Sequence, residues 1–434
     1  MTTPTRCTVL LAILLCSATT ALTAGSPSMD NVAEQYVKLV LALGQHDPDY
    51  VDAYHGPDAW QAEALSAKAT LEQIHTRADV LLKNLDAMND VRGEMPVLRH
   101  QYLSKQLRAL RTRTEMLQGK KFLFDEESRL LYDAVAPVFP EEHFKTLIAK
   151  LEPLLPGEGT LLARYDRFRS NFVIPKDRLD TVFTAAIAEC RKRTKEYIRL
   201  PPGESFTIEY VTDKPWSGYN WYKGNSHSLI QVNTDLPIYI ERAIDLAAHE
   251  GYPGHHVYNV LLEEHLLKER GWIEFSVYPL FSPQSLVAEG SANYGIHMAF
   301  SNADRLTFSR NVLFPLAGLD PSQAERYYTV FDIASELSYA GNEAARGYLN
   351  GTMTREAAVQ WLMDYALMAR DRAEQRVRFM EKYRSYVINY NLGQDMVKEY
   401  IARRAGTSVT KRWEEFARLL SSPRLPSELV GGGK

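Results

Sequence analysis

The segment from His249 to His256 reads His-Glu-Gly-Tyr-Pro-Gly-His-His and constrains the fold more than any other part of the chain. Pro253 has no N–H group to donate to the carbonyl of His249, and its ring clashes with the same carbonyl in a regular helix. Gly251 and Gly254 permit the backbone torsions that a bulge or a tight break requires. We therefore predict a helix that is interrupted within this segment.

The histidines of this segment are spaced like a stretched HExxH motif, in which two histidines bind zinc and the glutamate polarises a water molecule. His255 stands six residues after His249, which on a regular helix means roughly 240° around the axis and about 9 Å along it. Two residues looped out after His249 would bring His255 to the position of the second ligand. His256 is the competing ligand, because i+7 returns to the azimuth of His249 at a rise of about 10.5 Å. The remaining alternative is a helix break without metal.

A third ligand is expected from residues 285–294, which read SLVAEGSANY and are predicted to form a helix. Glu289 has apolar and small neighbours there, and a buried unpaired carboxylate is costly unless a metal ion or a cation offsets it. The alternative is a helix-capping or salt-bridged glutamate. Asn293, one turn later, and Asp245, one turn before the first histidine, are candidates to orient a ligand from behind. His297 is interpreted as a packed core histidine.

Together, HEGYPGHH and VAEGSANY resemble the HExxPGHH and EGWALY motifs of a large group of mostly bacterial, often exported proteins of unassigned function. That group is similar to the helical zinc peptidases of the thimet oligopeptidase, carboxypeptidase Taq and angiotensin-converting enzyme type. The resemblance implies a large helical zinc-peptidase-like fold. It also implies zinc bound by His249, His255 and Glu289, with Glu250 as the general base.

The resemblance extends over much of the chain through YVDAYHGP near Tyr54, WYKGNSHSLIQVN before the histidine motif and FDIASELSYAGNEAARGYL after it. The histidine motif is specific, whereas each flanking match is weak by itself. The chain departs from the family pattern at Ser291 and Asn293, where Trp and Leu are usual. The packing behind Glu289 is therefore expected to differ, and with it the pocket.

Residues 1–24 are predicted to be a signal peptide, because Arg6 precedes an apolar stretch and small residues follow, with cleavage after Ala21 or Ala24. The mature protein is then exported, to the periplasm or outside the cell. Cys16 follows Leu15 rather than Gly, Ala or Ser, which disfavours a lipoprotein anchor. No later segment is long and apolar enough for a membrane span.

Cysteine use and charge narrow the protein's class further. Cys7 and Cys16 fall within the predicted signal peptide, which leaves Cys190 alone, so no internal disulfide is expected. A hydrophobic content of 45% with 24% charged residues is typical of a globular protein. The formal net charge of −4 provides no field for a polyanion, so nucleic acid is not expected as a partner.

Apolar residues recur at helical spacing along most of the mature chain, so the fold is predicted to be mainly α. Residues 206–211 and 228–233 alternate as strands, with an aromatic loop at 216–224 between them. This small sheet beside the metal helix is either an edge to which a peptide adds as a strand or a structural hairpin. The predicted helices cover residues 31–43, 60–85, 97–117, 126–131, 178–198, 322–339, 354–370 and 371–390.

The chain is predicted to form an N-terminal helical half at 25–200, a catalytic half at 201–425 and a flexible tail at 426–434, with the cleft between the halves. Tyrosine hydroxyls could stabilise an oxyanion, and we predict Tyr386 and Tyr390 as catalytic residues. Tyr339 and Tyr383 are further candidates for the same role. Arg346 or Arg384 could bind a substrate carboxylate, but the preferred interpretation of each is an ordinary surface or ion-paired arginine.

These observations favour a zinc-dependent hydrolase, a peptidase in which Glu250 accepts a proton from a zinc-activated water and passes it to the leaving amine. The substrate is then a peptide or a small amide. Two alternatives remain: a zinc-dependent hydrolase of another amide or ester, and a non-catalytic exported binding protein that retains the fold. The sequence gives no indication of the oligomeric state.

Overall fold

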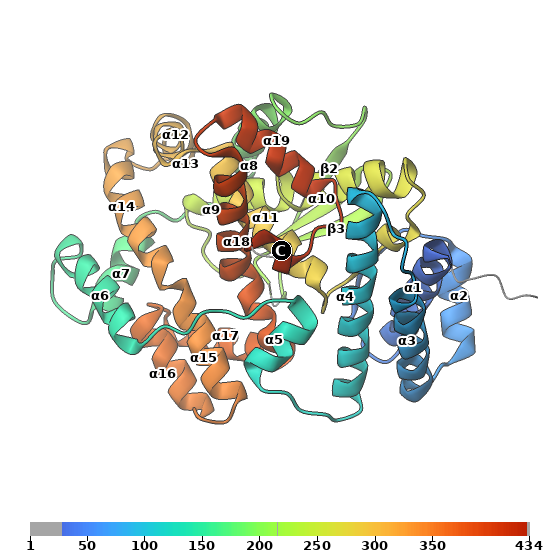
Figure 1. Cartoon of the computed structure of the whole chain (residues 1–434). Coiled ribbons are helices and arrows are strands. Elements are labelled where there is room, and N and C mark those ends of the chain that lie inside the picture. The colour runs from blue at the N-terminus through green and yellow to red at the C-terminus, as the bar shows by residue number, and fades with distance from the viewer. Residues whose placement is uncertain (1–27, 215, 432–434) are drawn as a thin grey trace, which may run out of the picture.

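A computed structural model of the protein describes residues 28–214 and 216–431 (Figure 1). The predicted signal peptide, with Cys7 and Cys16, lies outside the described residues. The described chain is mainly helical with two small sheets, which confirms the predicted fold class. None of its helices is long and apolar enough to cross a membrane.

The N-terminal part consists of helices joined by short loops. The helix predicted at 60–85 is wrong as a single element, because Lys68 adopts a left-handed conformation with φ 47° and ends the first of two helices. Thr70 then starts the second with a capping box, its side chain accepting from the backbone N–H of Gln73. The helices are α1 (Met29–Gly44), α2 (Asp58–Ala67), α3 (Leu71–Asp86), α4 (Glu94–Leu117), α5 (Phe124–Tyr132), α6 (Glu141–Leu151), α7 (Leu161–Ser170) and α8 (Leu179–Lys195).

Three strands precede the histidine segment and form a sheet in the order β2-β4-β3. The strands β2 (Ser205–Val211) and β4 (His227–Asn233) are parallel, and β3 (Gly218–Gly224) is antiparallel to β4. The aromatic loop predicted at 216–224 is therefore wrong over β3. Its aromatic residues have high β propensity, and Trp221 donates from Nε1 to Gln231 on β4 at 3.0 Å.

A second, two-stranded sheet joins distant parts of the chain. The strand β1 (Val51–Tyr54) pairs antiparallel with β5 (Val277–Pro279). β5 follows a short 3-10 turn, η5 (Ile273–Ser276), and leads toward the helix that carries Glu289. The N-terminal segment is thus fixed beside the site-bearing half.

The C-terminal part is again helical, and Figure 1 shows α18 near the centre of the molecule beside α11. The helix predicted at 371–390 is broken at Arg384, whose φ is 52°, so α17 ends at Tyr383. The larger helices are α9 (Glu241–Leu246), α10 (His255–Leu262), α11 (Pro283–Ala299), α12 (Asn302–Phe308), α14 (Ala324–Ser335), α15 (Ala340–Leu349), α16 (Arg355–Tyr365), α17 (Arg370–Tyr383), α18 (Ile388–Ala405) and α19 (Val409–Leu420).

The chain packs further toward its end than the sequence indicated. Residues Pro426–Leu429 form a short helix, α20, and Leu429 is fully buried. One hydrophobic core extends from α1 through α11 and α18 to α19. A smaller cluster lies where α6 and α7 pack near α14 and α16. The two predicted halves therefore share one core.

A buried ion pair ties the N-terminal helices to the segment that precedes α11. Arg99 on α4 donates from Nε and Nη2 to both carboxylate oxygens of Glu274 in η5, at 2.6 and 3.0 Å. The Glu274 side chain is 0% exposed and that of Arg99 is 6% exposed. Arg99 also donates to Asp30 on α1 at 2.5 Å. Burial raises the pKa of Glu274, and the charge of Arg99 opposes that rise.

Replacing Arg99 with Met should destabilise the fold by about 3 kcal/mol, because Glu274 would keep its burial and lose its counter-ion. Denaturant unfolding of the wild type and the variant measures this loss. The double variant Arg99→Met with Glu274→Met should recover much of the stability, since both charges are then removed. A single variant as stable as the wild type would contradict the role of this pair.

Candidate metal centre

The predicted interruption lies at the expected place. Helix α9 runs into a π-helical turn, η3 (Ala247–Gly251), after which the chain bends at a cis Tyr252–Pro253 peptide and α10 begins. The wider turn accommodates the extra residues, and the backbone N–H of Gly254 donates to the carbonyl of Ala248 at 2.8 Å. A looped-out segment after the first histidine is thus confirmed.

Gly254 is required at this bend for steric reasons. A Cβ atom at this position would lie 1.9 Å from the carbonyl oxygen of His249 and 2.4 Å from that of Ala248. Both contacts are with backbone atoms, which cannot move aside as a flexible side chain would. Only glycine therefore allows the chain to return close enough for α10 to start beside the first histidine.

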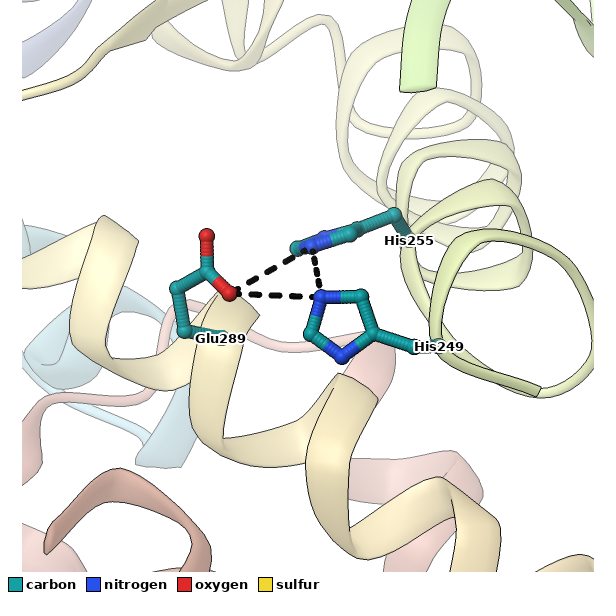
Figure 2. Close-up of side chains that lie close together, drawn as sticks. All are labelled: His249, His255 and Glu289. Atoms are coloured by element: carbon teal, nitrogen blue, oxygen red, sulfur yellow. Dashed lines mark hydrogen bonds and ion pairs between the residues drawn. The ribbon is translucent and has the colours of Figure 1, made fainter. Parts of the chain in front are cut away.

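Two histidines and one glutamate converge across this bend (Figure 2). The Nε2 atoms of His249 and His255 are 3.1 Å apart. Oε2 of Glu289, on the facing helix α11, lies 3.4 Å from His249 Nε2 and 3.7 Å from His255 Nε2. The three side chains point toward one another, and their ligand atoms all lie within 4.8 Å of one another. We refer to these three residues as the metal group.

These spacings fit a tetrahedral ion. Ligand bonds of about 2.0–2.2 Å at tetrahedral angles place neighbouring ligand atoms about 3.3–3.6 Å apart. Oε2 of Glu289 is buried and has no hydrogen-bond partner within the described part of the chain. A buried carboxylate oxygen without a donor is unusual unless a cation takes that place. The group could therefore hold a metal ion.

The electrostatics of the group are strongly coupled. Burial by itself raises the pKa of Glu289, but the two neighbouring histidines outweigh burial and hold this pKa well below its usual range. Burial lowers the pKa of His255, but Glu289 and then Glu250 outweigh it and raise the pKa to about 9. A carboxylate that stays ionised among imidazoles is the charge state that a divalent cation requires.

Asn293 supports the first histidine from behind, as predicted. His249 Nδ1 lies 2.9 Å from Asn293 Oδ1, and an amide oxygen can only accept, so Nδ1 carries the proton and Nε2 keeps its lone pair for a metal. The Asn293 amide donates in turn to the carbonyl of Tyr390 at 2.9 Å. The other residue predicted for this role, Asp245, instead faces Arg242, and their charged groups lie 3.7 Å apart.

Tyr386 and Tyr390 lie at the site in different roles. The Tyr386 hydroxyl donates to Oε1 of Glu289 at 2.8 Å, so it holds the carboxylate. The ring of Tyr390 is 5.8 Å from that of Tyr386 and also faces the site cavity. No hydrogen bond of the Tyr390 hydroxyl is found among the described residues, which leaves this donor available. Tyr339 donates to Asp395 at 2.7 Å instead.

The competing histidine points away from the group. His256 is fully buried, with Nδ1 2.8 Å from the Ser228 hydroxyl on β4 and Nε2 3.2 Å from Oε2 of Glu204. It therefore anchors α10 to the sheet. His297 lies 3.1 Å from the Gln394 amide and outside the group, as its interpretation as a core histidine indicated.

The position of Glu289 depends on a close backbone contact between α11 and α18. A Cβ atom on Gly290 would lie 2.4 Å from the carbonyl carbon of Gly393, and one on Gly393 would lie 2.8 Å from the carbonyl oxygen of Leu286. Both helices can approach this closely only with glycine at both positions. This contact is the reason that small residues follow Glu289.

A cavity of about 1090 Å³ opens beside the group. His249, Glu250, His255 and Glu289 line it together with the β3 segment 218–221. Glu250 is buried next to β3, since a Cβ atom on Gly218 would lie 3.0 Å from its Oε1. The carboxylate of the predicted general base therefore reaches the same cavity as the metal group.

The two arginines considered as binders of a substrate carboxylate are ion-paired. Arg384 pairs with Glu127 at 2.6 Å. Arg346 pairs with Glu343 at 2.7 Å and with Asp125 at 3.0 Å. The preferred interpretation of both as ion-paired arginines is confirmed, and neither residue lines the cavity.

Two cavity residues were missed by sequence reasoning. Asp52 on β1 lines the cavity, accepts a hydrogen bond from Tyr219, and has its pKa raised to about 7 by burial. The signal was a single carboxylate within the segment YVDAYHGP, which lies far from the histidines in sequence. Arg376 on α17 also lines the cavity and is one of many arginines in a charged helix.

No protein-family model and no curated protein matches the chain. Among solved structures, the chain is similar to a candidate lipoprotein from Colwellia psychrerythraea, with 13% identity and a TM-score of 0.50, over 93% of this chain and 76% of that one. It also aligns with a candidate lipoprotein of unknown function from Shewanella oneidensis (14% identity, TM-score 0.49, 94% and 88% covered). A third alignment is with the structure named BsuCP, with 12% identity and a TM-score of 0.47, over 91% of this chain and 88% of that one. The Colwellia structure shows that the helical fold is shared.

Replacing Gly393 with Ala should lower the free energy of unfolding by about 2 kcal/mol, because the added methyl group meets the backbone of α11. It should also weaken metal binding, since α11 carries Glu289. Gly341→Ala is the matched control, because a Cβ atom there meets nothing within 4 Å. Denaturant unfolding and zinc titration of both variants test the contact, and equal behaviour of the two would contradict it.

The bound metal should depend on His255 and not on His256. We expect His255→Ala and His249→Ala to lose the metal found in the wild type, and His256→Gln to retain about one ion per chain. Elemental analysis of the purified proteins, each checked for folding by circular dichroism, measures this. Loss of metal from folded His256→Gln with retention in His255→Ala would reverse the assignment.

Proposed function

We propose that this protein is a zinc-dependent hydrolase and, within that class, a peptidase. The observation that carries the proposal is the convergence of His249, His255 and Glu289 at tetrahedral spacing in a cavity that Glu250 also lines. Two imidazoles and one carboxylate are a ligand set that suits zinc and leaves one coordination position open. The unpartnered buried oxygen of Glu289 supports the same assignment.

In this proposal His249, His255 and Glu289 hold the zinc ion. A bound zinc ion supplies Lewis acidity, which polarises a carbonyl group and lowers the pKa of a water molecule toward neutrality. Asn293 fixes the ring of His249 by accepting from Nδ1 at 2.9 Å. Tyr386 fixes the carboxylate of Glu289 from its other oxygen, so both ligands keep their orientation.

Glu250 serves as general base and then as general acid. It accepts a proton from the attacking water as the oxygen bonds to the carbonyl carbon, and it delivers that proton to the nitrogen as the C–N bond breaks. Its backbone carbonyl accepts from the Asn220 amide at 2.7 Å, which ties the base to β3. The backbone of the base is therefore fixed against β3.

Tyr390 is the donor that we assign to the oxyanion. Its hydroxyl is available among the described side chains, whereas that of Tyr386 is committed to Glu289. Burial and the nearby charge of Glu289 raise the pKa of Tyr390, so the phenol remains protonated and able to donate. A donor that strengthens its bond as charge develops lowers the barrier of the reaction.

A peptide is the substrate class that the cavity favours. β3 is an edge strand of its sheet, and its residues 218–221 line the cavity next to Glu250. An extended peptide can add to such an edge through main-chain hydrogen bonds. Tyr219 and Trp221 lie in the same wall with rings 4.5 Å apart, and they offer an aromatic surface to a side chain.

The proposal includes export from the cytoplasm, because residues 1–24 read as a signal peptide. The Colwellia protein of the same fold is described as a candidate lipoprotein. Hydrolysis of another amide or an ester is the second candidate, since the same group would activate water for it. Binding without cleavage is the third, and an intact general base beside the metal group argues against it.

Replacing Glu250 with Gln should leave zinc content unchanged and reduce kcat on peptides by roughly 100-fold to 10000-fold, because the amide cannot accept the proton. Elemental analysis and cleavage of a peptide library by wild type and variant measure both quantities. Asp49→Asn is the control, because Asp49 faces Lys382 at 2.9 Å on the cavity rim. Full activity of the Gln variant would remove Glu250 from the mechanism.

A further inference from the structure

Arg376 lies in the wall of the metal cavity without a counter-ion. It stands on α17, lines the cavity, and is partly buried. Its Nε atom is buried and has no hydrogen-bond partner in the described chain. The contacts of its guanidinium group are aromatic: the central carbon lies 4.9 Å from the ring centre of Phe379 and 5.9 Å from that of Tyr390.

Arg376 differs in this respect from the arginines described above. Arg99, Arg346 and Arg384 each have a carboxylate partner at 3.0 Å or less. No described carboxylate forms an ion pair with Arg376, and burial lowers its pKa with only Tyr390 acting in the opposite direction. An arginine side chain nevertheless stays charged. A partly desolvated cation facing a cavity is a cost that a bound anion would offset.

Arg372, one turn earlier on α17, extends this positive wall. It lines the cavity as well. Burial lowers the pKa of Arg372, and the nearby positive charges of Arg169 and Arg242 lower it further, whereas the negative charge of Asp371 partly offsets them. The carboxylates of Glu250 and Glu289 line the same cavity.

Tyr390 links Arg376 to the residues around the metal group. Its ring centre lies 5.9 Å from the guanidinium carbon of Arg376, and its backbone carbonyl accepts from Asn293, which contacts His249. Arg376 and the three residues of the metal group also line the same cavity. A substrate that occupies this cavity could therefore present an anion to Arg376.

We propose that Arg376 binds a carboxylate of a substrate peptide held in this cavity, so that the enzyme prefers peptides that carry such an anion. This inference rests on the proposed peptidase function and specifies its substrate class. The carboxylate has two possible sources, the C-terminus of the peptide or an Asp or Glu side chain. The forked guanidinium group binds either in a bidentate manner.

Binding in the zinc-loaded Glu250→Gln protein tests the inference separately from catalysis. Calorimetry would compare three forms of one tetrapeptide: with a free C-terminal carboxylate, with a C-terminal amide, and with the amide plus a Glu as last residue. Each form would be titrated into the Glu250→Gln protein, and into the same protein carrying Arg376→Met, Arg376→Lys or Arg378→Met. Arg378 is the matched control, because it is an exposed arginine of the same helix.

We expect at least one carboxylate form to bind roughly 100-fold more tightly than the plain amide, the loss typical when a desolvated ion pair is broken. Arg376→Met should abolish that preference, Arg376→Lys should retain part of it, and Arg378→Met should retain all of it. A preference for the free terminus identifies the C-terminus as the source, and a preference for the Glu amide identifies the side chain.

Equal binding of all three peptides, binding of none, or an unchanged preference in Arg376→Met would overturn the inference. Cleavage by the zinc-loaded wild type is measured in parallel. Peptide cleavage without carboxylate preference would leave the peptidase proposal standing and remove the inference. Carboxylate preference in binding without cleavage of any peptide would support the role of Arg376 in binding and contradict the peptidase proposal.

Thermal unfolding provides a control for folding of the variant. Arg376→Met removes a cation without a partner, so its midpoint should equal or exceed that of the wild type. A tight-binding peptide should raise the midpoint of the parent protein and not that of Arg376→Met. A lower midpoint for Arg376→Met would mean that the arginine supports the fold, which contradicts a binding role.

Discussion

The backbone contact between α11 and α18 is the constraint on which the candidate site depends. Gly290 and Gly393 let the two helices approach until their main chains touch. At this separation Glu289 on α11 lies within reach of the Tyr386 hydroxyl, which precedes α18, and Asn293 reaches the carbonyl of Tyr390 on α18. One candidate ligand, Glu289, and the support of another, His249, are thus fixed by a single helix crossing.

Much of the fold and of the site was predictable from local sequence. Helical periodicity predicted most of the helices, because amphipathic spacing is a property of one segment. The histidine motif predicted the interruption and its residues, since Pro253 and Gly254 act on their own backbone. Glu289 could be predicted as the third member of the group because a carboxylate among apolar neighbours indicates a partner.

The rest depended on contacts between distant segments. Asp52 enters the cavity through the pairing of β1 with β5, and Arg376 through the placement of α17. The ion pairs of Arg346 and Arg384 depend largely on the same kind of contact, since their partners Asp125 and Glu127 lie on the distant helix α5. Only Glu343, three residues before Arg346 on α15, is a local partner. Whether an arginine is paired is a tertiary property.

The two adjacent histidines that follow the bend, His255 and His256, contact different parts of the structure. His255 faces the metal group, whereas His256 is bonded to Ser228 on β4 and to Glu204 just before β2. Helix α10 is therefore anchored to the sheet that offers β3 to the cavity. A chain bound along that edge would have its register relative to His255 fixed by this anchor, without a closing movement of the sheet.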